Sequence, residues 1–100
     1  MNDHRLTPER ITAYADHLRR EERASGTIEK YLRDVRAFAA WTEGRAVTQE
    51  LAAEWKGHLL STGHAPGTVN SMLAALNGLF RFLGWEDCRT KFLKIQRQMF

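Results

Sequence analysis

The sequence predicts an all-α fold, a small bundle of four to five helices built from two helix pairs. Strand signals are nearly absent, because β-branched residues are few and no segment alternates apolar and polar residues with period two. Glycine and proline divide the chain into short segments with apolar residues at helical spacing. A third observation is the scheme G-T-[IV]-x-x-[YM]-L-x-x-[VL]-x-x-[FL], which occurs at residues 26–38 and again, 41 residues later, at residues 67–79. Two helices therefore begin alike and bury alike faces within a repeated unit.

The first pair comprises helices over residues 8–22 and 25–42. Thr7 is a good N-cap for the first helix, and Pro8 suits the first helical position. Ser25 is the expected N-cap of the second helix, which carries the first copy of the repeat. A glycine two residues after this helix favours its termination there.

The second pair follows the same order. A helix begins after Thr48, another good N-cap, and Gly63 closes it. The helix over residues 67–83 carries the second copy of the repeat, and Gly84 ends it. Short connections predict that neighbouring helices pack against one another.

A fifth helix is expected from about Asp87 towards the C-terminus. Its apolar seam is thin and consists of Phe92, Ile95 and Met99. A seam that runs to the final residues suggests that another domain or a partner covers it.

The composition indicates one domain over residues 1–100, with ordinary hydrophobic and charged shares of 43% and 27%. No apolar run approaches the roughly 20 residues that cross a bilayer, so no membrane partner is expected. The N-terminus has no apolar region typical of a secretory signal. The one cysteine, Cys88, cannot form an internal disulfide, which favours a reducing cytoplasm.

The net charge of +3 is unevenly placed along the chain. Residues 1–50 hold nine basic and nine acidic residues, whereas residues 51–100 hold six basic and three acidic residues. Arg89, Lys91, Lys94 and Arg97 occur near the C-terminus without any acid among residues 88–100. This distribution fits either a polyanion partner or an ordinary solvated basic face.

The outward face of the 67–83 helix is neutral. No Lys, Arg, Asp or Glu occurs in the 24 residues from Gly57 to Phe80, although solvent-facing helices usually carry them. Small or hydrogen-bonding side chains can contact base edges in a DNA major groove. The alternative is that this helix is central and buried on most sides. The residues of this face are Thr68, Asn70, Ser71, Ala74, Ala75, Asn77 and Gly78.

The starts of the two repeat-bearing helices form a second candidate site. Backbone N–H groups at a helix N-terminus attract phosphate, and Lys30 and Arg33 add positive charge near the start of the 25–42 helix. Gly67 and Thr68 begin the other helix at the matching place. For the first of these starts, an ordinary surface pair of Glu29 with Arg33 is the competing interpretation.

Catalytic and cofactor motifs are absent from the sequence. The four histidines are scattered, and no Cys/His ligand spacing, phosphate-binding glycine loop or nucleophile motif is recognisable. We therefore expect no metal, no cofactor and no catalytic residue in this chain. The three tryptophans are expected in the core rather than in base stacking.

Four segments resemble the N-terminal core-binding domain of tyrosine recombinases, the lambda-type integrases. In that family a helix opens with S/T-x-T-[IV]-x-x-Y and continues through L-x-x-[VL/F] to an aromatic residue. Here the similarity covers about residues 8–98. The segments are 25–38 (SGTIEKYLRDVRAF), 48–60, 65–83 (APGTVNSMLAALNGLFRFL) and 92–98 (FLKIQRQ).

The resemblance implies a SAM-like orthogonal bundle that clamps one side of a DNA duplex while a C-terminal catalytic domain clamps the other. It implies that the two repeat-bearing helices face the major groove. It also implies a nucleophilic tyrosine in the catalytic domain, for which Tyr14 and Tyr31, both at core spacing, are no counterparts. The residues we predict to contact DNA are Thr27, Glu29, Lys30, Arg33, Gly67, Thr68, Asn70, Ser71, Ala74, Lys91, Lys94 and Arg97.

The function expected from the sequence is therefore that of a non-catalytic DNA-binding domain of a site-specific recombinase or integrase. Its expected partners are duplex DNA, the catalytic domain of the same parent protein and neighbouring protomers on DNA. The alternative is a helical protein–protein interaction module, whose neutral helix face would bind a partner irrespective of salt.

Overall fold

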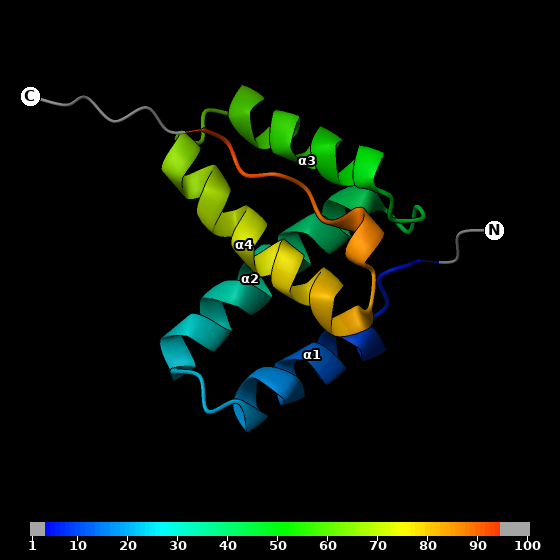
Figure 1. Cartoon of the computed structure of the whole chain (residues 1–100), viewed down its shortest axis with the longest axis vertical. Coiled ribbons are helices and arrows are strands. Elements are labelled where there is room, and N and C mark those ends of the chain that lie inside the picture. Colours follow the sequence, from blue (N-terminus) through cyan, green and yellow to red (C-terminus); the bar gives the residue numbers. More distant parts are fainter. Residues whose placement is uncertain (1–3, 95–100) are drawn as a thin grey trace, which may run out of the picture.

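The structure, a computed structural model, describes residues 4–94 and is all-helical over that range (Figure 1). α2 and α4 cross near the centre and share the largest interface, while α1 and α3 lie on either side of the crossing. None of the helices in residues 4–94 has the length and apolar character needed to cross a membrane. The elements are α1 (Pro8–Arg20), α2 (Ser25–Thr42), α3 (Gln49–Ser61), α4 (Pro66–Leu83) and the 3₁₀ turn η1 (Glu86–Cys88).

The repeat extends to both helix pairs. Adding 41 to the bounds of α1 and α2 gives the bounds of α3 and α4, so the helices of each equivalent pair have the same length. The N-caps also match, because the Thr7 hydroxyl accepts from the Arg10 amide at 3.2 Å and the Thr48 hydroxyl accepts from the Leu51 amide at 3.0 Å. The fold is thus two copies of one helix pair, and the N-caps predicted for α1 and α3 are confirmed.

The predicted bounds of α2 are confirmed, but its predicted N-cap is wrong. Its N-cap is Ala24, whose equivalent Ala65 caps α4, and neither helix start has a side-chain cap. Ser25 is therefore the first helical residue. Both helices end with a left-handed residue, Glu43 at φ 51° and Gly84 at φ 76°. Gly84 thus ends α4 as the sequence predicts, while Glu43 holds the same conformation one residue before the glycine at position 44.

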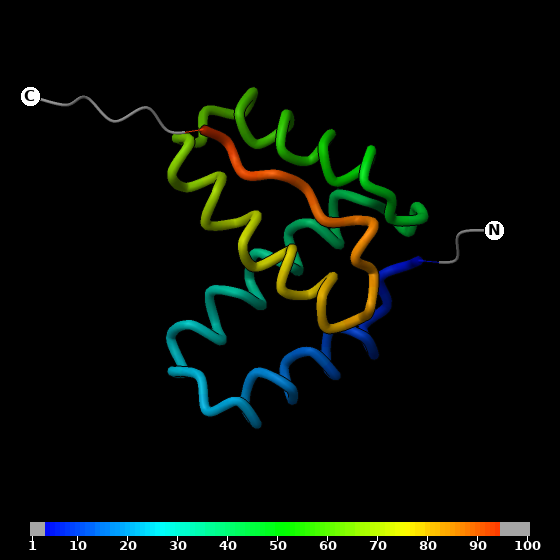
Figure 2. Tube along the Cα trace, in the orientation of Figure 1, coloured from blue at the N-terminus to red at the C-terminus, as the bar shows by residue number. Residues whose placement is uncertain are grey.

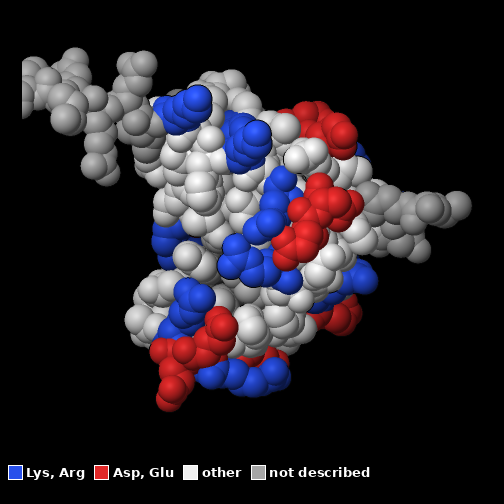
Figure 3. Space-filling model, in the orientation of Figure 1, with Lys and Arg blue, Asp and Glu red and all other residues white. Residues whose placement is uncertain are grey.

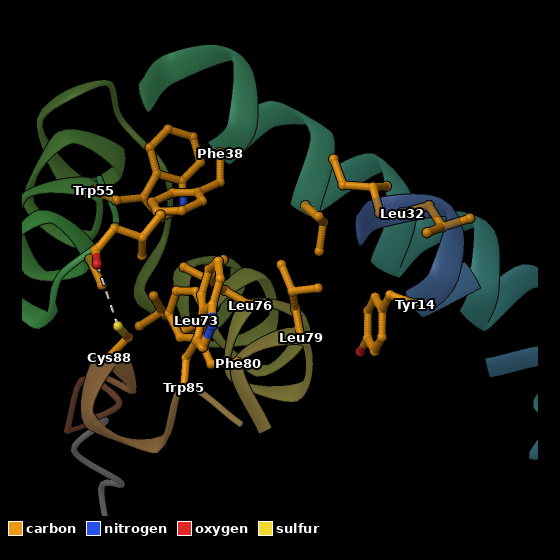
Figure 4. Close-up of a cluster of buried hydrophobic side chains, with 14 of the residues drawn as sticks. Tyr14, Leu32, Phe38, Trp55, Leu73, Leu76, Leu79, Phe80, Trp85 and Cys88 are labelled. Carbon is orange, nitrogen blue, oxygen red and sulfur yellow. Dashed lines mark hydrogen bonds between the residues drawn. The ribbon is translucent and has the colours of Figure 1, made fainter. Parts of the chain in front are cut away.

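The hydrophobic core lies where the two pairs meet (Figure 4). Phe38 from α2 packs edge-on against Trp55 from α3, with ring centroids 5.6 Å apart, and against Phe80 from α4 at 6.2 Å. Trp85, which follows α4, lies 6.2 Å from the Phe80 ring. The prediction that the tryptophans belong to or border the core is confirmed, since Trp55 and Trp85 are buried and the half-buried Trp41 packs against the core.

The predicted fifth helix is wrong over residues 89–94. After η1 the chain is extended and runs along α3 and α4 (Figure 2). Four side chains bind its backbone and compete with helical hydrogen bonding. Of the predicted seam, Phe92 is 53% exposed, and Ile95 and Met99 lie outside the described residues. The bonds run from Gln49 to Arg89 O (3.3 Å), Lys56 to Lys91 O (2.9 Å), Asn77 to Thr90 O (2.9 Å) and Asn70 to Leu93 O (2.9 Å).

Candidate nucleic-acid interface

A groove of about 470 Å³ opens between the N-terminal halves of α2 and α4. We call it the α2/α4 groove. The start of α4 lines this groove, but its equivalents at the start of α2, Gly26 and Thr27, do not, because α2 contributes residues from its second and third turns. Five of the predicted DNA-contacting residues line it, and Asp34, His64 and Met72 complete the lining. The five are Lys30, Arg33, Gly67, Thr68 and Ser71.

The groove carries net positive charge because its one acid is neutralised. Asp34 is 7% exposed, and the Lys30 ammonium lies 2.5 Å from its carboxylate oxygen, one helical turn away. The same ammonium donates to the Ser71 carbonyl at 3.4 Å, which ties α2 to α4. Arg33 is exposed and adds a further cation at the groove. Lys30 and the buried Asp34 thus form a neutral pair, and Arg33 supplies the net positive charge of the groove.

The two helix starts differ in exposure. Gly67 and Thr68 are exposed at the start of α4, whereas Thr27 is half-buried at the start of α2. Glu29 is exposed but does not line the groove. Pro66 at the start of α4 has no N–H, while the Gly67 and Thr68 amides have no intrahelical acceptor and no side-chain cap. An anion entering the groove would therefore meet free donors at α4 in particular.

The neutral face of α4 is partly covered by the chain itself. The Asn70 amide nitrogen donates to the Leu93 carbonyl at 2.9 Å, and its oxygen accepts from the Leu93 amide at 2.7 Å. Asn77 makes the same pair of bonds with Thr90, at 2.9 and 3.1 Å. A bidentate contact from Asn70 to a base would therefore require residues 89–94 to move away.

Other residues of this face divide between core and surface. Ala75 is fully buried, so its placement on the outward face is wrong. Ala74 and Ser71 are half-buried, and Thr68 is exposed. The face is thus neither fully open nor enclosed, and its open part lies at the N-terminal end of α4.

The predicted basic residues near the C-terminus lie away from the α2/α4 groove. Lys91 and Lys94 are exposed on the extended segment, and Arg97 lies outside the described residues. Arg89 is exposed and forms a 2.8 Å ion pair with Glu86. On the face in Figure 3, basic side chains lie dispersed over the molecule with acidic ones beside several of them. Positive charge is therefore spread over this face rather than concentrated in one patch.

His64 is a groove residue that sequence reasoning missed. It lies in the α3–α4 connection, and its Nδ1 is 3.1 Å from both the Leu59 carbonyl oxygen and the Thr62 hydroxyl. Donation from Nδ1 to Leu59 fixes the tautomer that leaves Nε2 as an acceptor. No spacing in the sequence connects this residue to Lys30 or Arg33, because the fold alone brings them together.

Three potential metal-ligating side chains, one from the N-terminal segment and two from η1, lie close together. Ligand atoms of His4, Asp87 and Cys88 lie within 4.8 Å of one another. Burial raises the pKa of the Cys88 thiol to about 11, and the thiol donates to the Val47 carbonyl at 3.6 Å (Figure 4). The His4 ring also stacks on Trp85 with ring centroids 4.5 Å apart, and the absence of a metal stays a prediction.

The two tyrosines of residues 4–94 pack against other side chains, which does not suit a nucleophile. Tyr14 is 2% exposed, and burial raises its pKa to about 12. Tyr31 is half-buried on α2. A phenol whose pKa is raised holds its proton more firmly, which opposes nucleophilic attack.

Two helix pairs joined in a duplicated bundle, with a cationic groove where the repeated helices cross, define a small helical domain of the SAM-like class. The sequence matches the family described as phage integrase, N-terminal SAM-like domain, over residues 11–87. The chain belongs to this family, which confirms the resemblance to integrases of the tyrosine recombinase class. Among curated proteins, none matches the chain with significance. The matched domain is the N-terminal domain of integrases and not their catalytic domain.

Proposed function

We propose that this chain is a non-catalytic DNA-binding domain of a tyrosine recombinase that holds duplex DNA at the α2/α4 groove. The observation that carries the proposal is the convergence of Lys30, Arg33 and the start of α4 on one concave surface. Cations and free backbone N–H groups are the donors that phosphate oxygens accept from. The membership in an integrase N-terminal domain family supports the same ligand.

Most of the binding free energy comes from phosphate contacts in this proposal. Lys30 and Arg33 neutralise phosphates, while Thr68 and the first amides of α4 donate to phosphate oxygens. In this proposal Ser71 contacts the base edges, because the side-chain amide of Asn70 is already hydrogen-bonded to the Leu93 backbone. Few phosphate contacts predict weak and salt-sensitive binding by the domain alone.

The other partners follow from the family. A catalytic domain of the same parent protein would hold the opposite side of the duplex, and neighbouring protomers would bind adjacent DNA. The cytoplasm, which the sequence also favours, is the proposed location. Thr27, Glu29 and Ala74 are retained as secondary contacts, while Lys91, Lys94 and Arg97 extend the basic surface.

The test is fluorescence anisotropy of a labelled duplex over a series of salt concentrations. Arg33→Ala should weaken binding about 3- to 10-fold and reduce the slope of log K against log salt by about 1. Arg36→Ala is the matched control, since Arg36 is an exposed arginine of α2 that does not line the groove. Equal losses of duplex affinity in the two variants, or an affinity that does not change with salt concentration, would contradict the proposal and favour a protein–protein interaction module.

A further inference from the structure

A second groove, of about 650 Å³, lies between α1, the C-terminal half of α4 and the 89–94 segment. We call it the aromatic groove. The half-buried His17 and Phe82 form one wall in front of the buried Tyr14, with the Phe82 ring 5.6 Å from Tyr14 and 4.7 Å from His17. Tyr31 and Phe92 also line the groove. Phe92 is 53% exposed, so an aromatic face there is available to a planar ligand.

The charged residues of the aromatic groove are mostly basic. Three arginines line it: Arg23 and Arg89 are ion-paired with Glu21 and Glu86, whereas Arg81 forms no ion pair with a described residue. The one acid in the lining, Glu21, lies 3.4 Å from both His17 and Arg23 and is thereby neutralised. A ligand that combines planar rings with negative charge therefore complements this surface.

The two grooves adjoin along α4. Gly67, Thr68 and Ser71 face the α2/α4 groove, and Ala74, Gly78 and Arg81 face the aromatic groove. From Thr68 onward these positions recur every three to four residues, so they form one stripe of the helix. On α2, Lys30 lines the first groove and Tyr31 the second, with the Lys30 ammonium 5.7 Å from the Tyr31 ring centroid.

The extended segment is what creates the aromatic groove. Its backbone is fixed on α4 by Asn70 and Asn77, and this register turns Phe92 and Arg89 outward to form the far wall. Thr90 points inward and is 8% exposed. The two asparagines thus position groove residues through the backbone that they bind.

We infer that the aromatic groove binds an unpaired stretch of DNA strand adjacent to the duplex held in the α2/α4 groove. Aromatic side chains beside a basic track are the common arrangement for single-stranded nucleic acid, because bases stack on the rings while cations follow the phosphates. A duplex buries its base faces, so exposed aromatic side chains gain little from it. The inference rests on the proposed function for the orientation of the DNA, but not for the affinity of the groove for a single strand.

The experiment compares three labelled DNAs by fluorescence anisotropy with the whole chain. They are a blunt duplex, the same duplex with a six-nucleotide thymidine tail, and the thymidine oligonucleotide alone. Stacking of one base on Phe92 predicts about 10-fold tighter binding of the tailed duplex than of the blunt one. Phe92→Ala should remove this advantage, and Phe92→Trp should restore it.

Two control variants separate the grooves. Leu60→Ala truncates the other large exposed hydrophobic side chain of residues 4–94 and should leave all three affinities unchanged. Arg33→Ala should weaken both duplexes equally and preserve the advantage of the tail. Circular dichroism of each variant checks that the fold is intact.

The outcomes distinguish the two ideas. A tailed duplex that binds no better than the blunt one overturns the inference and leaves the proposed function intact. Binding of the oligonucleotide that is lost in Phe92→Ala, without binding of the blunt duplex, supports the inference and overturns the proposed function. An advantage of the tail that survives in Phe92→Ala also overturns the inference.

Discussion

The outward faces of α2 and α4 differ although their inward faces match. Leu32 and Leu73 occupy equivalent buried positions, 41 residues apart. At the outward positions, Glu29 and Arg36 of α2 are exposed, whereas their equivalents Asn70 and Asn77 are half-buried and bind the backbone of the 89–94 segment. The comparison teaches that the neutral outward face of α4 has an intramolecular role.

The equivalent positions also meet where the two pairs contact each other. The Lys30 ammonium donates to the carbonyl of its equivalent, Ser71, at 3.4 Å. The Cys88 thiol donates to the carbonyl of its equivalent, Val47, at 3.6 Å. Both contacts join the two halves of the repeat through equivalent residues, although the side chains at the two positions differ.

Gly78 gives the largest expected effect among the equivalent pairs. Its counterpart in α2 is the exposed Ala37, but a Cβ at Gly78 would lie 2.7 Å from the Tyr14 hydroxyl oxygen. The Tyr14 ring is buried, so its hydroxyl must shift to admit the added methyl group. Gly78→Ala should therefore lower the free energy of unfolding by about 2 kcal/mol, measured by urea denaturation.

A second substitution tests the reason for this effect. In Tyr14→Phe the hydroxyl is gone, and the next atom, Cζ, lies 3.8 Å from the added Cβ, an ordinary contact. Gly78→Ala in that background should be neutral or stabilise by up to about 1 kcal/mol through helix propensity. Equal losses in the two backgrounds would show that the hydroxyl is not the obstacle.

The asparagines of α4 give the next largest effect. Replacing both Asn70 and Asn77 by alanine removes four hydrogen bonds to residues 90 and 93 and should cost about 1–3 kcal/mol in unfolding free energy. Hydrogen exchange of the Thr90 and Leu93 amides should accelerate, because both lose their acceptors.

The matched control is the equivalent pair in α2. Glu29→Ala with Arg36→Ala should change the unfolding free energy by less than about 0.5 kcal/mol, since both side chains are exposed and neither binds another segment. Unchanged exchange at Thr90 and Leu93 in the asparagine variant would refute the positioning role of these residues.

The sequence predicted the helices well because their signals are local. Thr7, Thr48 and Gly84 act within one turn of the helix ends that they mark, so the helix bounds were predicted to within two residues. The prediction of Ser25 as the N-cap of α2 was wrong because a serine, although a good N-cap, also fits the first helical turn. The repeated scheme of apolar residues is sufficient by itself to identify α2 and α4 as equivalents.

The surface was harder to predict because its signals are not local. An asparagine has the same donor and acceptor for a base edge as for a peptide group, so Asn70 and Asn77 gave no indication of their partner. Residues 89–94 have no clear helix or strand propensity. Hydrogen bonds from side chains of α3 and α4 to their backbone favour the extended conformation. His64 lies in the α2/α4 groove because of the tertiary fold, so no local sequence pattern could have predicted its place. The buried Asp34 was also missed, although its spacing from Lys30 permits a one-turn ion pair.

Cys88 gives a pH dependence of stability that its equivalent, Val47, lacks and that is absent at neutral pH. Burial raises the pKa of the folded thiol from 9.0 to about 11, so between these values the unfolded chain binds fewer protons than the folded one. The free energy of unfolding should therefore be unaffected by the thiol below pH 9 and decrease as the pH rises towards 11. Urea denaturation at pH 7, 9 and 10.5 measures this decrease.

Cys88→Val, which makes the two equivalents identical, should show a shallower decrease, because only groups such as Tyr14 then contribute. Parallel pH profiles for the two proteins would mean that the thiol titrates in the folded state as it does in the unfolded chain.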